Sequence, residues 1–453
     1  MCAGTVEERS IVEPVRAVLG NKGKFFEAKC TEIMPEERSI VACFPEDAGF
    51  PEACFKIPYD TLVLGVGCIN NTFGIQGVQE NTLFFKSVED AGKLRLRVSE
   101  CFERSALPQT TAEERRKLLS FVIVGGGPTG VEVAAELYDL IVDDLSKLYP
   151  EQVKDFRIRV VDLMSHVLST YDRKISNYTA ETFKRNGIDL VLNSRVQGVT
   201  SDSVTVVDND GNVTELPFGA CVWATVFFAL GDAATIEQQK ALDKADELFE
   251  RAPKDSKGGI SLKGLREIMR EAAKEFPHLE EHSSFLDSKT GIMRFGGVVA
   301  KAFASASVGS SNGAATSAIY KDIDENSTLD REQFKDLLKT IDLGLRALPA
   351  TAQVAKQEGE FLASVFAKND IRPGFTMESK TKPFEYFHKG SLAYVGSDRA
   401  VMDVPVIGPV MGLFAGFAWR GFETFSQISF RNQCLVTIDW ARTKVFGRDT
   451  SRV

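Results

Sequence analysis

The sequence contains no Cys-x-x-Cys pair and only 4 histidines, which argues against a structural zinc site. Its 8 cysteines are scattered along the chain, and we expect reduced, mostly buried thiols rather than a disulfide framework. His278 and His282 have the i, i+4 spacing of a helix. The adjacent Pro277 and a loop-like context nevertheless favour solvated side chains over metal ligands.

Excess positive charge and long apolar runs are also missing. The 54 lysines and arginines are outnumbered by 63 aspartates and glutamates, and the net charge of -9 argues against nucleic-acid binding. No run of about 18 or more apolar residues could span a bilayer. The acidic first residues do not resemble a signal peptide or a mitochondrial presequence. With 453 residues, 43% of them hydrophobic, the chain suits about three domains of a soluble or peripheral enzyme.

The strongest positive signal is a glycine loop. A β-branched run at residues 120–124 ends in this loop, and a helix-forming segment follows at once. Gly125, Gly127 and Gly130 have the dinucleotide-binding spacing: the first allows a tight turn, the second admits a diphosphate, and the third permits close helix–strand packing. The diphosphate would lie at the positive end of the helix. The alternative is a strand–turn–helix without a ligand.

Sequence patterns divide the chain into four parts. Residues 1–118 mix short strands with turns and include a buried strand, Tyr59–Gly67, that ends in glycines. Residues 119–225 form a Rossmann-like unit, which continues with strand Ile158–Leu163, a helix around Ser176–Asn186, strand Leu190–Leu192 and a hairpin with a type I′ turn at Asn209-Asp210-Gly211. Residues 235–347 are helix-rich and charged, and residues 348–453 return to helix and strand before an aromatic, amphipathic tail.

Several further segments follow one another in a set order: Gly4–Glu7, Ser10–Pro14, Tyr59–Gly67, Asn71–Ile75, Ala229–Ala234, Leu348–Gln357, Gly390–Gly396 and Phe446–Arg452. Together with the glycine loop they resemble the type II NADH dehydrogenases, the single-chain NADH:quinone oxidoreductases that do not pump protons. More narrowly, the chain resembles their external mitochondrial branch, which carries an EF-hand insertion. The most specific segment is Leu-Pro-Ala-Thr-Ala-Gln-Val-Ala at residues 348–355.

The resemblance implies an α/β fold with two Rossmann-like domains of the FAD/NAD(P)-binding, pyridine nucleotide-disulfide oxidoreductase type. It implies that NADH passes a hydride to FAD and that two electrons then reduce a membrane quinone. It also implies a homodimer, peripheral on the lipid bilayer of the mitochondrial inner membrane at the intermembrane-space face. The corresponding domains are 1–118 (remainder of the FAD domain), 119–225 (NADH domain), 226–234 (return strand of the FAD domain), 235–347 (helical EF-hand-like insertion) and 348–453 (quinone-site helix and membrane-docking region).

Cofactor-binding residues follow from the same resemblance. The NADH diphosphate is expected on Gly125, Gly126, Gly127, Pro128 and Gly130. Asp162 would bind the adenosine ribose hydroxyls, where most relatives have a glutamate. Since a carboxylate repels a 2′-phosphate, NADH should bind better than NADPH. The FAD site would include Gly65, Gly231 and Asp232.

Three side chains are expected at the reacting centre. Glu132 would face the junction of nicotinamide and flavin, and the alternative is a solvated glutamate that the helix dipole favours in the first turn. Gln353 and Gln357 are one helical turn apart and share a face. In the family this face lies between flavin and quinone. The alternative is that it packs internally, with its amides bonded within the protein.

Two departures from the family pattern bear on activity. Relatives begin with a glycine fingerprint for the FAD diphosphate, and none appears here before Tyr59. Residues 221–230 also form a strand-like stretch without a turn, although in relatives its two halves belong to different domains. We therefore expect a truncated and internally shortened member. The alternative function is a non-catalytic regulatory or interaction protein that keeps the scaffold.

The insertion contains two degenerate EF-hand loops. The second would offer calcium the oxygen atoms of Asp322, Asp324 and Asn326. There, however, Ser327 replaces the sixth-position glycine and Gln333 replaces the bidentate glutamate. The first loop, Pro253–Gly264, has a proline, a lysine and a glycine at ligand positions. We expect a weak or absent calcium site.

The C-terminal tail bears on location. Val404–Trp419 is apolar but only 16 residues long and contains two prolines, which suits an interfacial or buried segment rather than a span. Beyond it, aromatic residues alternate with the basic residues Arg420, Arg431, Arg442, Lys444, Arg448 and Arg452. This combination suits an anionic membrane surface, with a dimer interface on the same aromatics as the alternative.

Overall fold

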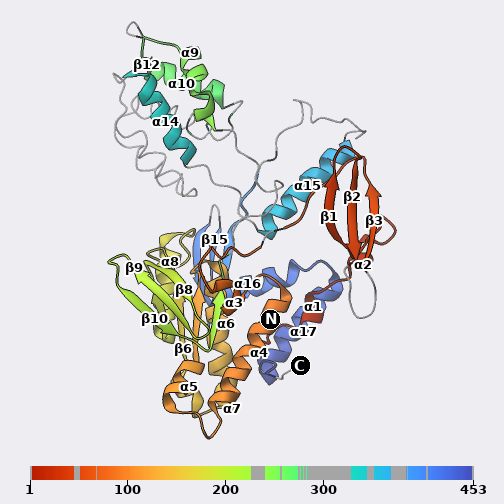
Figure 1. Cartoon of the computed structure of the whole chain (residues 1–453), viewed down its shortest axis with the longest axis vertical. Helices are drawn as coiled ribbons and strands as arrows, with labels where there is room; N and C mark the ends of the chain where they lie inside the picture. The colour runs from red at the N-terminus through yellow and green to blue at the C-terminus, as the bar shows by residue number, and fades with distance from the viewer. Residues whose placement is uncertain are drawn as a thin grey trace. The chain divides into compact units, whose positions relative to one another are not determined.

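A computed structural model describes residues 3–44, 52–67, 69–225, 240–255, 258–273, 328–343, 351–368, 386–404 and 407–450, together with residues 276, 279, 282 and 384. The chain forms two compact units (Figure 1). The first contains residues 1–228 and 350–453, and the second contains residues 229–349. The predicted insertion, residues 235–347, falls within the second unit.

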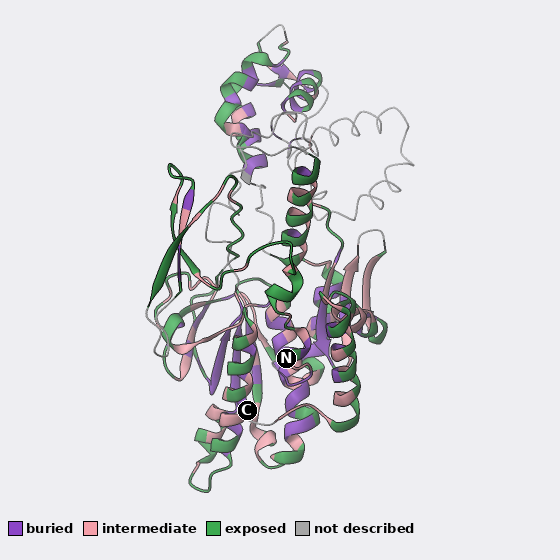
Figure 2. Ribbon diagram, turned by 90° about the vertical axis from the view of Figure 1, so that its right-hand side faces the viewer, coloured by how far each residue is buried: buried purple, intermediate pink, exposed green. Residues whose placement is uncertain are grey.

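The first unit is built around a five-stranded parallel sheet, so the predicted Rossmann-like α/β class is confirmed. The strand order is β4-β11-β5-β6-β7, with bounds Leu83–Phe84, Ala220–Trp223, Ser120–Val124, Arg157–Val161 and Ile188–Val191. Strand β5 lies between β11 and β6, and all of its residues are buried (Figure 2). A parallel strand covered on both faces needs a continuous apolar run, which explains the β-branched sequence of β5.

The two faces of this sheet are covered differently. Phe121 and Ile123 of β5 pack in a core with helices, whereas Val122 and Val124 pack against a second, antiparallel sheet. The helical elements are α4 (Val88–Ser105), α5 (Ala112–Leu118), α6 (Pro128–Asp139), the π-helix η1 (Leu140–Leu145), α7 (Ser146–Leu148), the 3-10 turn η2 (Gln152–Asp155) and α8 (Arg173–Asn186). The glycine loop thus joins the most buried strand to α6.

Helix α4 corrects the expectation of only short strands and turns in the N-terminal part. It begins with a capping box: Asp90 N–H donates to the Ser87 hydroxyl, and Ser87 N–H donates to the Asp90 carboxylate. Its buried residues include Leu94, Val98 and Phe102. Ser-x-x-Asp followed by apolar residues at helical spacing is the sequence signal that predicts this helix.

The antiparallel sheet consists of β8 (Ser194–Val199), β9 (Ser203–Asp208) and β10 (Val213–Pro217). The predicted hairpin β9–β10 forms, but the predicted type I′ turn is wrong. Only Gly211 in this loop has a positive φ, of 83°. The Asp208 carboxylate accepts hydrogen bonds from the N–H groups of Asp210 and Asn212, which stabilises a longer loop.

The N-terminal part contains α1 (Glu8–Ile11), α2 (Val15–Leu19), α3 (Val78–Asn81) and the antiparallel sheet β1-β2-β3 (Lys29–Met34, Ser39–Phe44 and Ala53–Pro58). The prediction of a buried strand at Tyr59–Gly67 is wrong. The segment is irregular, and Val66 is 66% exposed. A buried strand needs neighbouring strands for its backbone hydrogen bonds, and no strand in the described ranges pairs with this segment.

The expectation of reduced thiols is wrong for one pair of cysteines. Cys43 of β2 lies directly opposite Cys54 of β3, and the two form a disulfide. Directly opposite residues of antiparallel strands project from the same face, which permits the bond. Within the described part of the chain, Cys101 and Cys221 are free and buried, and two further free cysteines, Cys30 and Cys434, are exposed.

The C-terminal part contains α15 (Ala352–Lys368), the antiparallel sheet β14-β15-β16 (Ser391–Gly396, Arg399–Val404 and Gly408–Gly412), α16 (Leu413–Phe425) and α17 (Phe430–Phe446). None of the described helices is both long and apolar enough to cross a membrane. The two ends of the chain meet along α17. Glu7 N–H donates to the Asp439 carboxylate at 2.9 Å, and the Thr443 hydroxyl donates to the Thr5 carbonyl at 3.0 Å.

The second unit contains η3 (Ala241–Lys244), α9 (Ala245–Arg251), β12 (Ile260–Ser261), α10 (Leu262–Ala272), β13 (Thr328–Leu329) and α14 (Arg331–Leu343). Ile260 and Leu329, at position eight of the two predicted loops, pair across the short sheet β12–β13. A Cβ on Gly264, at position twelve of the first loop, would overlap the Pro253 carbonyl oxygen. This loop therefore has no room for a bidentate glutamate. Asp322, Asp324 and Asn326 lie outside the described residues.

Candidate functional site

The glycine loop lies at the carboxyl end of the parallel sheet, where open α/β sheets bind their ligands. Gly125 has a φ of 113°, and its N–H donates to the Val161 carbonyl at 2.8 Å. Gly127 is the N-cap of α6 and Pro128 is its first residue. No side chain of the described residues caps this helix. Its first N–H groups are therefore placed to bind an anion.

The glycines of this loop serve different purposes. A Cβ on Gly130 would overlap the Gly125 carbonyl oxygen, so the packing of α6 on the loop requires glycine there. A Cβ on Gly127 would meet no described atom within 4 Å, and its φ of -74° is open to any residue. Gly127 therefore leaves space for a ligand, whereas Gly130 allows α6 to pack closely on the loop.

Asp162 immediately follows β6 and lies against the glycine loop. Its carboxylate accepts hydrogen bonds from the N–H groups of Gly126 and Met164, the latter at 2.6 Å. Leu168 N–H in turn donates to the Gly126 carbonyl at 2.8 Å. The structure thus brings the residue predicted for the ribose into contact with the loop predicted for the diphosphate.

Glu132, on α6, points toward the C-terminal part of the first unit. Its Oε1 accepts hydrogen bonds from the Tyr394 backbone N–H at 3.0 Å and from Trp419 Nε1 at 3.1 Å. The residue as a whole is partly accessible, but its carboxyl is buried. This burial raises the pKa of Glu132 to about 8 and outweighs the two hydrogen-bond donors, which favour the charged form. The side chain is therefore not a solvated first-turn glutamate.

Gln353 and Gln357 project from the same side of α15 and bind one segment. Gln353 Oε1 accepts hydrogen bonds from the Tyr386 hydroxyl and from the Lys389 N–H, both at 2.8 Å. The Gln357 amide bonds in both directions with the Phe387 backbone at 2.9 Å. Both amides are thus engaged within the protein, as the packing alternative expects.

The residues assigned to FAD are not brought together by the described structure. Gly65 lies in the irregular segment that follows β3, and a Cβ there would meet no described atom within 4 Å. Gly231 and Asp232, with the predicted return strand 226–234, lie outside the described residues.

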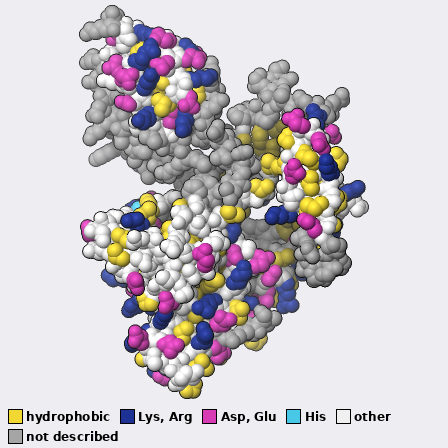
Figure 3. Space-filling view, viewed as in Figure 1, with side chains coloured by type: hydrophobic (Ala, Val, Ile, Leu, Met, Phe, Trp, Pro, Cys, Tyr) yellow, Lys and Arg dark blue, Asp and Glu magenta, His cyan; other side chains and the backbone are white. Residues whose placement is uncertain are grey.

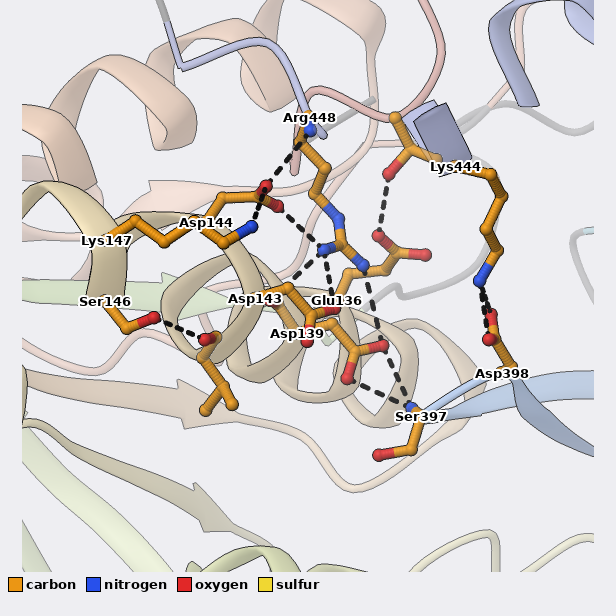
Figure 4. A network of polar contacts seen from close by, with 12 residues as sticks. Glu136, Asp139, Asp143, Asp144, Ser146, Lys147, Ser397, Asp398, Lys444 and Arg448 are labelled. Carbon is orange, nitrogen blue, oxygen red and sulfur yellow. Dashed lines mark hydrogen bonds and ion pairs between the residues drawn. The ribbon is translucent and has the colours of Figure 1, made fainter. Parts of the chain in front are cut away.

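The contacts that join α6 to the C-terminal part are not predicted by any sequence pattern. Besides Tyr394 and Trp419, these include the Arg448 guanidinium, which lies among the carboxylates of Asp139, Asp143 and Asp144 (Figure 4). Tyr394 and Arg448 belong to segments that carry the family resemblance. Their place in these segments marks both residues in the sequence but does not predict what either one contacts.

The described basic residues of the tail form ion pairs with acidic residues of the same chain, although the side chains of Arg431 and Lys444 remain more than half exposed. Arg420 and Lys444 contact Asp398, Arg442 contacts Glu7, Arg431 contacts Glu13, and Arg448 contacts three aspartates. Arg452 lies outside the described residues. Several phenylalanines of the tail are exposed, Phe414 by 73%, Phe425 by 78% and Phe430 by 80%. Trp419 and Trp440, by contrast, are partly buried and contact each other.

An uncapped glycine-loop helix on a parallel sheet, with a carboxylate after the next strand, defines a nucleotide-binding α/β oxidoreductase. In agreement, the family model of pyridine nucleotide-disulphide oxidoreductases matches residues 4–244. The NDH2 C-terminal domain model matches residues 388–449. External alternative NAD(P)H-ubiquinone oxidoreductase B1 of Solanum tuberosum mitochondria is 35% identical, over 99% of this chain and 82% of that protein. The chain therefore belongs to the type II NADH:ubiquinone oxidoreductases, which confirms the predicted family.

Other relatives agree. External alternative NAD(P)H-ubiquinone oxidoreductase B2 of Arabidopsis thaliana is 33% identical over 99% of this chain and 82% of its own length. The external NADH-ubiquinone oxidoreductase of Yarrowia lipolytica is 32% identical over 99% and 73%. The solved structure of NDH2 from Plasmodium falciparum with NADH shares the fold, with a TM-score of 0.75, 24% identity and coverage of 100% and 91%.

Proposed function

We propose that this chain is a peripheral membrane flavoprotein that oxidises NADH and reduces a membrane quinone without pumping protons. One observation carries the proposal. The N-terminus of α6 has no side-chain cap and has open space at Gly127, and the same helix carries Glu132, whose carboxyl accepts a hydrogen bond from the Tyr394 N–H. The ubiquinone reductase names of relatives that match 99% of the chain support it. FAD, when bound, supplies the hydride acceptor and passes on two electrons.

Each group of the site has a distinct task in this reaction. The N–H groups at the start of α6 bind the NADH diphosphate. The Asp162 carboxylate accepts hydrogen bonds from the ribose hydroxyls and repels a 2′-phosphate, which favours NADH over NADPH. Glu132 can hold a proton near neutral pH because its pKa is raised. Gln353 and Gln357 hold the segment 386–390 by hydrogen bonds, on the helix face that lies between flavin and quinone in the family.

The nucleotide assignment is tested with Gly127→Val. The valine can adopt the backbone conformation of Gly127 but fills the space proposed for the diphosphate. We expect wild-type stability and NADH affinity weakened by at least about tenfold, a loss of about 1.4 kcal/mol. Gly92→Val, at an exposed position of α4, is the matched control and should bind NADH normally. Equal NADH affinity of the two variants would reject the assignment.

Absorbance and turnover separate the enzyme from its alternative. Purified protein should show flavin absorbance at about 450 nm and should oxidise NADH with a soluble quinone. Saturable NADH binding with neither flavin nor quinone reduction would instead favour the non-catalytic interaction protein.

We further propose that α16 and α17 lie on a lipid surface. Exposed Phe414, Phe425 and Phe430 resemble an interfacial face, on which each buried ring contributes roughly 1.5–3 kcal/mol. Since the tail cations are paired with protein acids, we expect binding driven mainly by apolar contact and little changed by salt.

Docking is tested with the double variant Phe425→Ser and Phe430→Ser in a liposome sedimentation assay. It should lower membrane binding by at least about tenfold. Phe55→Ser, on the three-stranded sheet β1–β3, should leave membrane binding unchanged. Removing residues 404–453 is a poorer test because it also removes Arg448 from its aspartates. A double variant that binds liposomes normally but loses a dimer in ultracentrifugation would assign these rings to a dimer interface.

Location, assembly and calcium complete the proposal. The relatives are named external and mitochondrial, which supports the intermembrane-space face of the inner membrane. We propose a homodimer on family grounds. In the insertion, Gln333 Oε1 accepts a hydrogen bond from the Asp330 N–H at 3.0 Å, so the residue at position twelve caps α14. Calorimetry should therefore show no tight calcium binding, and Gln333→Glu should strengthen any weak binding.

A further inference from the structure

The C-terminal end of α6 is bound by an arginine from the end of the chain. The Arg448 side chain is only 10% exposed and donates to the Asp139 carbonyl at 3.1 Å and to the carboxylates of Asp143 and Asp144, both at 3.0 Å (Figure 4). Arg448 thus contacts both the backbone and the side chains at the point where α6 passes into the next helical segment. The π-helix η1 follows α6 directly and carries Asp143 and Asp144.

The approach of this arginine depends on local backbone geometry. Gly447 has a φ of 85°, and a Cβ there would lie 2.6 Å from Asp144 Oδ1. Across the contact, Gly4 has a φ of 71°, and its Cβ would overlap the Asp449 carbonyl. Both glycines allow close packing, Gly447 against Asp144 and Gly4 against Asp449, so Arg448 has a defined position rather than a loose surface contact.

Tyr394 joins the cluster of Arg448 and the aspartates to Glu132. Its hydroxyl donates to Asp139 Oδ2 at 2.6 Å, and its backbone N–H donates to Glu132 Oε1. Glu132 and Asp139 are seven residues apart, two helical turns, and so lie on the same side of α6. Arg448 therefore contacts Asp139, Asp139 contacts Tyr394, and Tyr394 contacts Glu132. The Trp419 indole donates a second hydrogen bond to Glu132.

We propose that Arg448 is a positioning residue: through Asp139 and Tyr394 it fixes α6 against the C-terminal part and so holds the Glu132 carboxyl in place and away from water. This inference rests on the proposed function, in which Glu132 stands beside the nicotinamide. It assigns a role in the reaction to a side chain in the final residues of the chain, about two helical turns from that carboxyl.

Water access makes the role measurable. A cavity of about 810 Å³ is lined by Asp139, Tyr394 and Arg448, whereas Glu132 is not among its described lining residues. Loosening the contacts would let water from this cavity reach Glu132 and lower its pKa from about 8 toward the usual 4.5. The charged or titratable groups that face Glu132 are Glu136 on α6, Glu423 on α16 and Tyr171 before α8, and none of them is changed below.

The experiment is a pH titration of tryptophan fluorescence, because Trp419 donates directly to Glu132. Wild-type protein should show a transition near pH 8 that is absent from Glu132→Gln. Arg448→Met should move this transition down by about one pH unit or more, Tyr394→Phe should move it by less, and Arg448→Lys should partly restore it. The same order is expected for the alkaline limb of the pH profile of NADH oxidation.

The matched control is Arg442→Met. Arg442 also holds α17, by its ion pair with Glu7 of the N-terminal segment at 2.6 Å, but no described contact joins it to Arg448, Asp139, Tyr394 or Glu132. It should lower stability and leave the fluorescence transition near pH 8. The inference fails if Arg448→Met titrates like wild type, or if wild type titrates like Glu132→Gln. Because fluorescence needs neither flavin nor turnover, an inactive protein that keeps these shifts would refute only the proposed function.

Discussion

Two stretches of this chain share one sequence pattern, an apolar run that ends in glycines, and they fold differently. Residues 120–127 form the buried strand β5 and the glycine loop, whereas Tyr59–Gly67 is irregular and exposed. The difference lies in their neighbours. Strand β5 hydrogen-bonds to β11 and β6, while the other stretch follows the edge of a small antiparallel sheet. A pattern therefore specifies a strand only where partner strands meet it.

The five-stranded parallel sheet and the three-stranded sheet β1–β3 also differ in how far neighbouring elements cover them. Burial on both faces holds the parallel sheet, whereas β1 and β3 are largely exposed and the sheet β1–β3 contains a disulfide. Hydrophobic side chains gather at its surface in Figure 3, and the exposed ones include Phe26, Ile33, Phe44 and Phe55. One sheet is stabilised by its core, and the other relies on a covalent link.

The largest expected effect breaks the glycine loop itself. Gly130→Val places atoms on the Gly125 carbonyl and should destabilise the first unit by about 3 kcal/mol or more. Gly65→Ala, at the corresponding end of the exposed stretch, meets open space and should change stability by less than about 0.5 kcal/mol. Urea unfolding measures both. Similar losses for the two variants would show that Tyr59–Gly67 is packed after all.

A smaller effect is expected in the three-stranded sheet. Cys54→Ser removes a disulfide that closes a short loop between β2 and β3, and should destabilise the sheet by about 2 kcal/mol. The control is Cys30→Ser, an exposed free thiol on β1, which should be neutral. Limited proteolysis between β2 and β3 gives the readout, since the parallel sheet should stay protected. Equal cleavage of both variants would contradict this role of the disulfide.

A pH-dependent effect, measured as a shift of the thermal midpoint, tests the burial of Glu132. An acid whose pKa is raised on folding binds its proton more tightly in the native state. Its contribution is therefore full below about pH 4.5 and is lost as the pH rises to about 8. Asp139, with its pKa raised by burial to about 6, acts in the same direction at lower pH. The thermal midpoint should fall by a few degrees between pH 5 and pH 8, and less in Glu132→Gln. Parallel curves for the two proteins would mean that the carboxyl is hydrated.

Much of the nucleotide-binding half could be predicted from residues alone. The strand β5, the loop and helix α6 follow from local pattern, and the shared face of Gln353 and Gln357 follows from helical spacing. The type I′ turn failed because the Asp208 side chain competes for the backbone N–H groups of the loop. The buried strand at Tyr59–Gly67 failed because periodicity carries no information about partner strands.

The sequence by itself determined the family, the fold class and the glycines that form a cradle, since these depend on neighbouring residues and on backbone geometry. Only the tertiary structure decided that Tyr394 and Trp419 bond to Glu132, that Arg448 binds the far end of the same helix, and that the tail cations are already paired. The contacts of Glu132 and Arg448 join residues more than 250 positions apart. Their energy comes from burial and charge pairing, which exist only after the chain has folded.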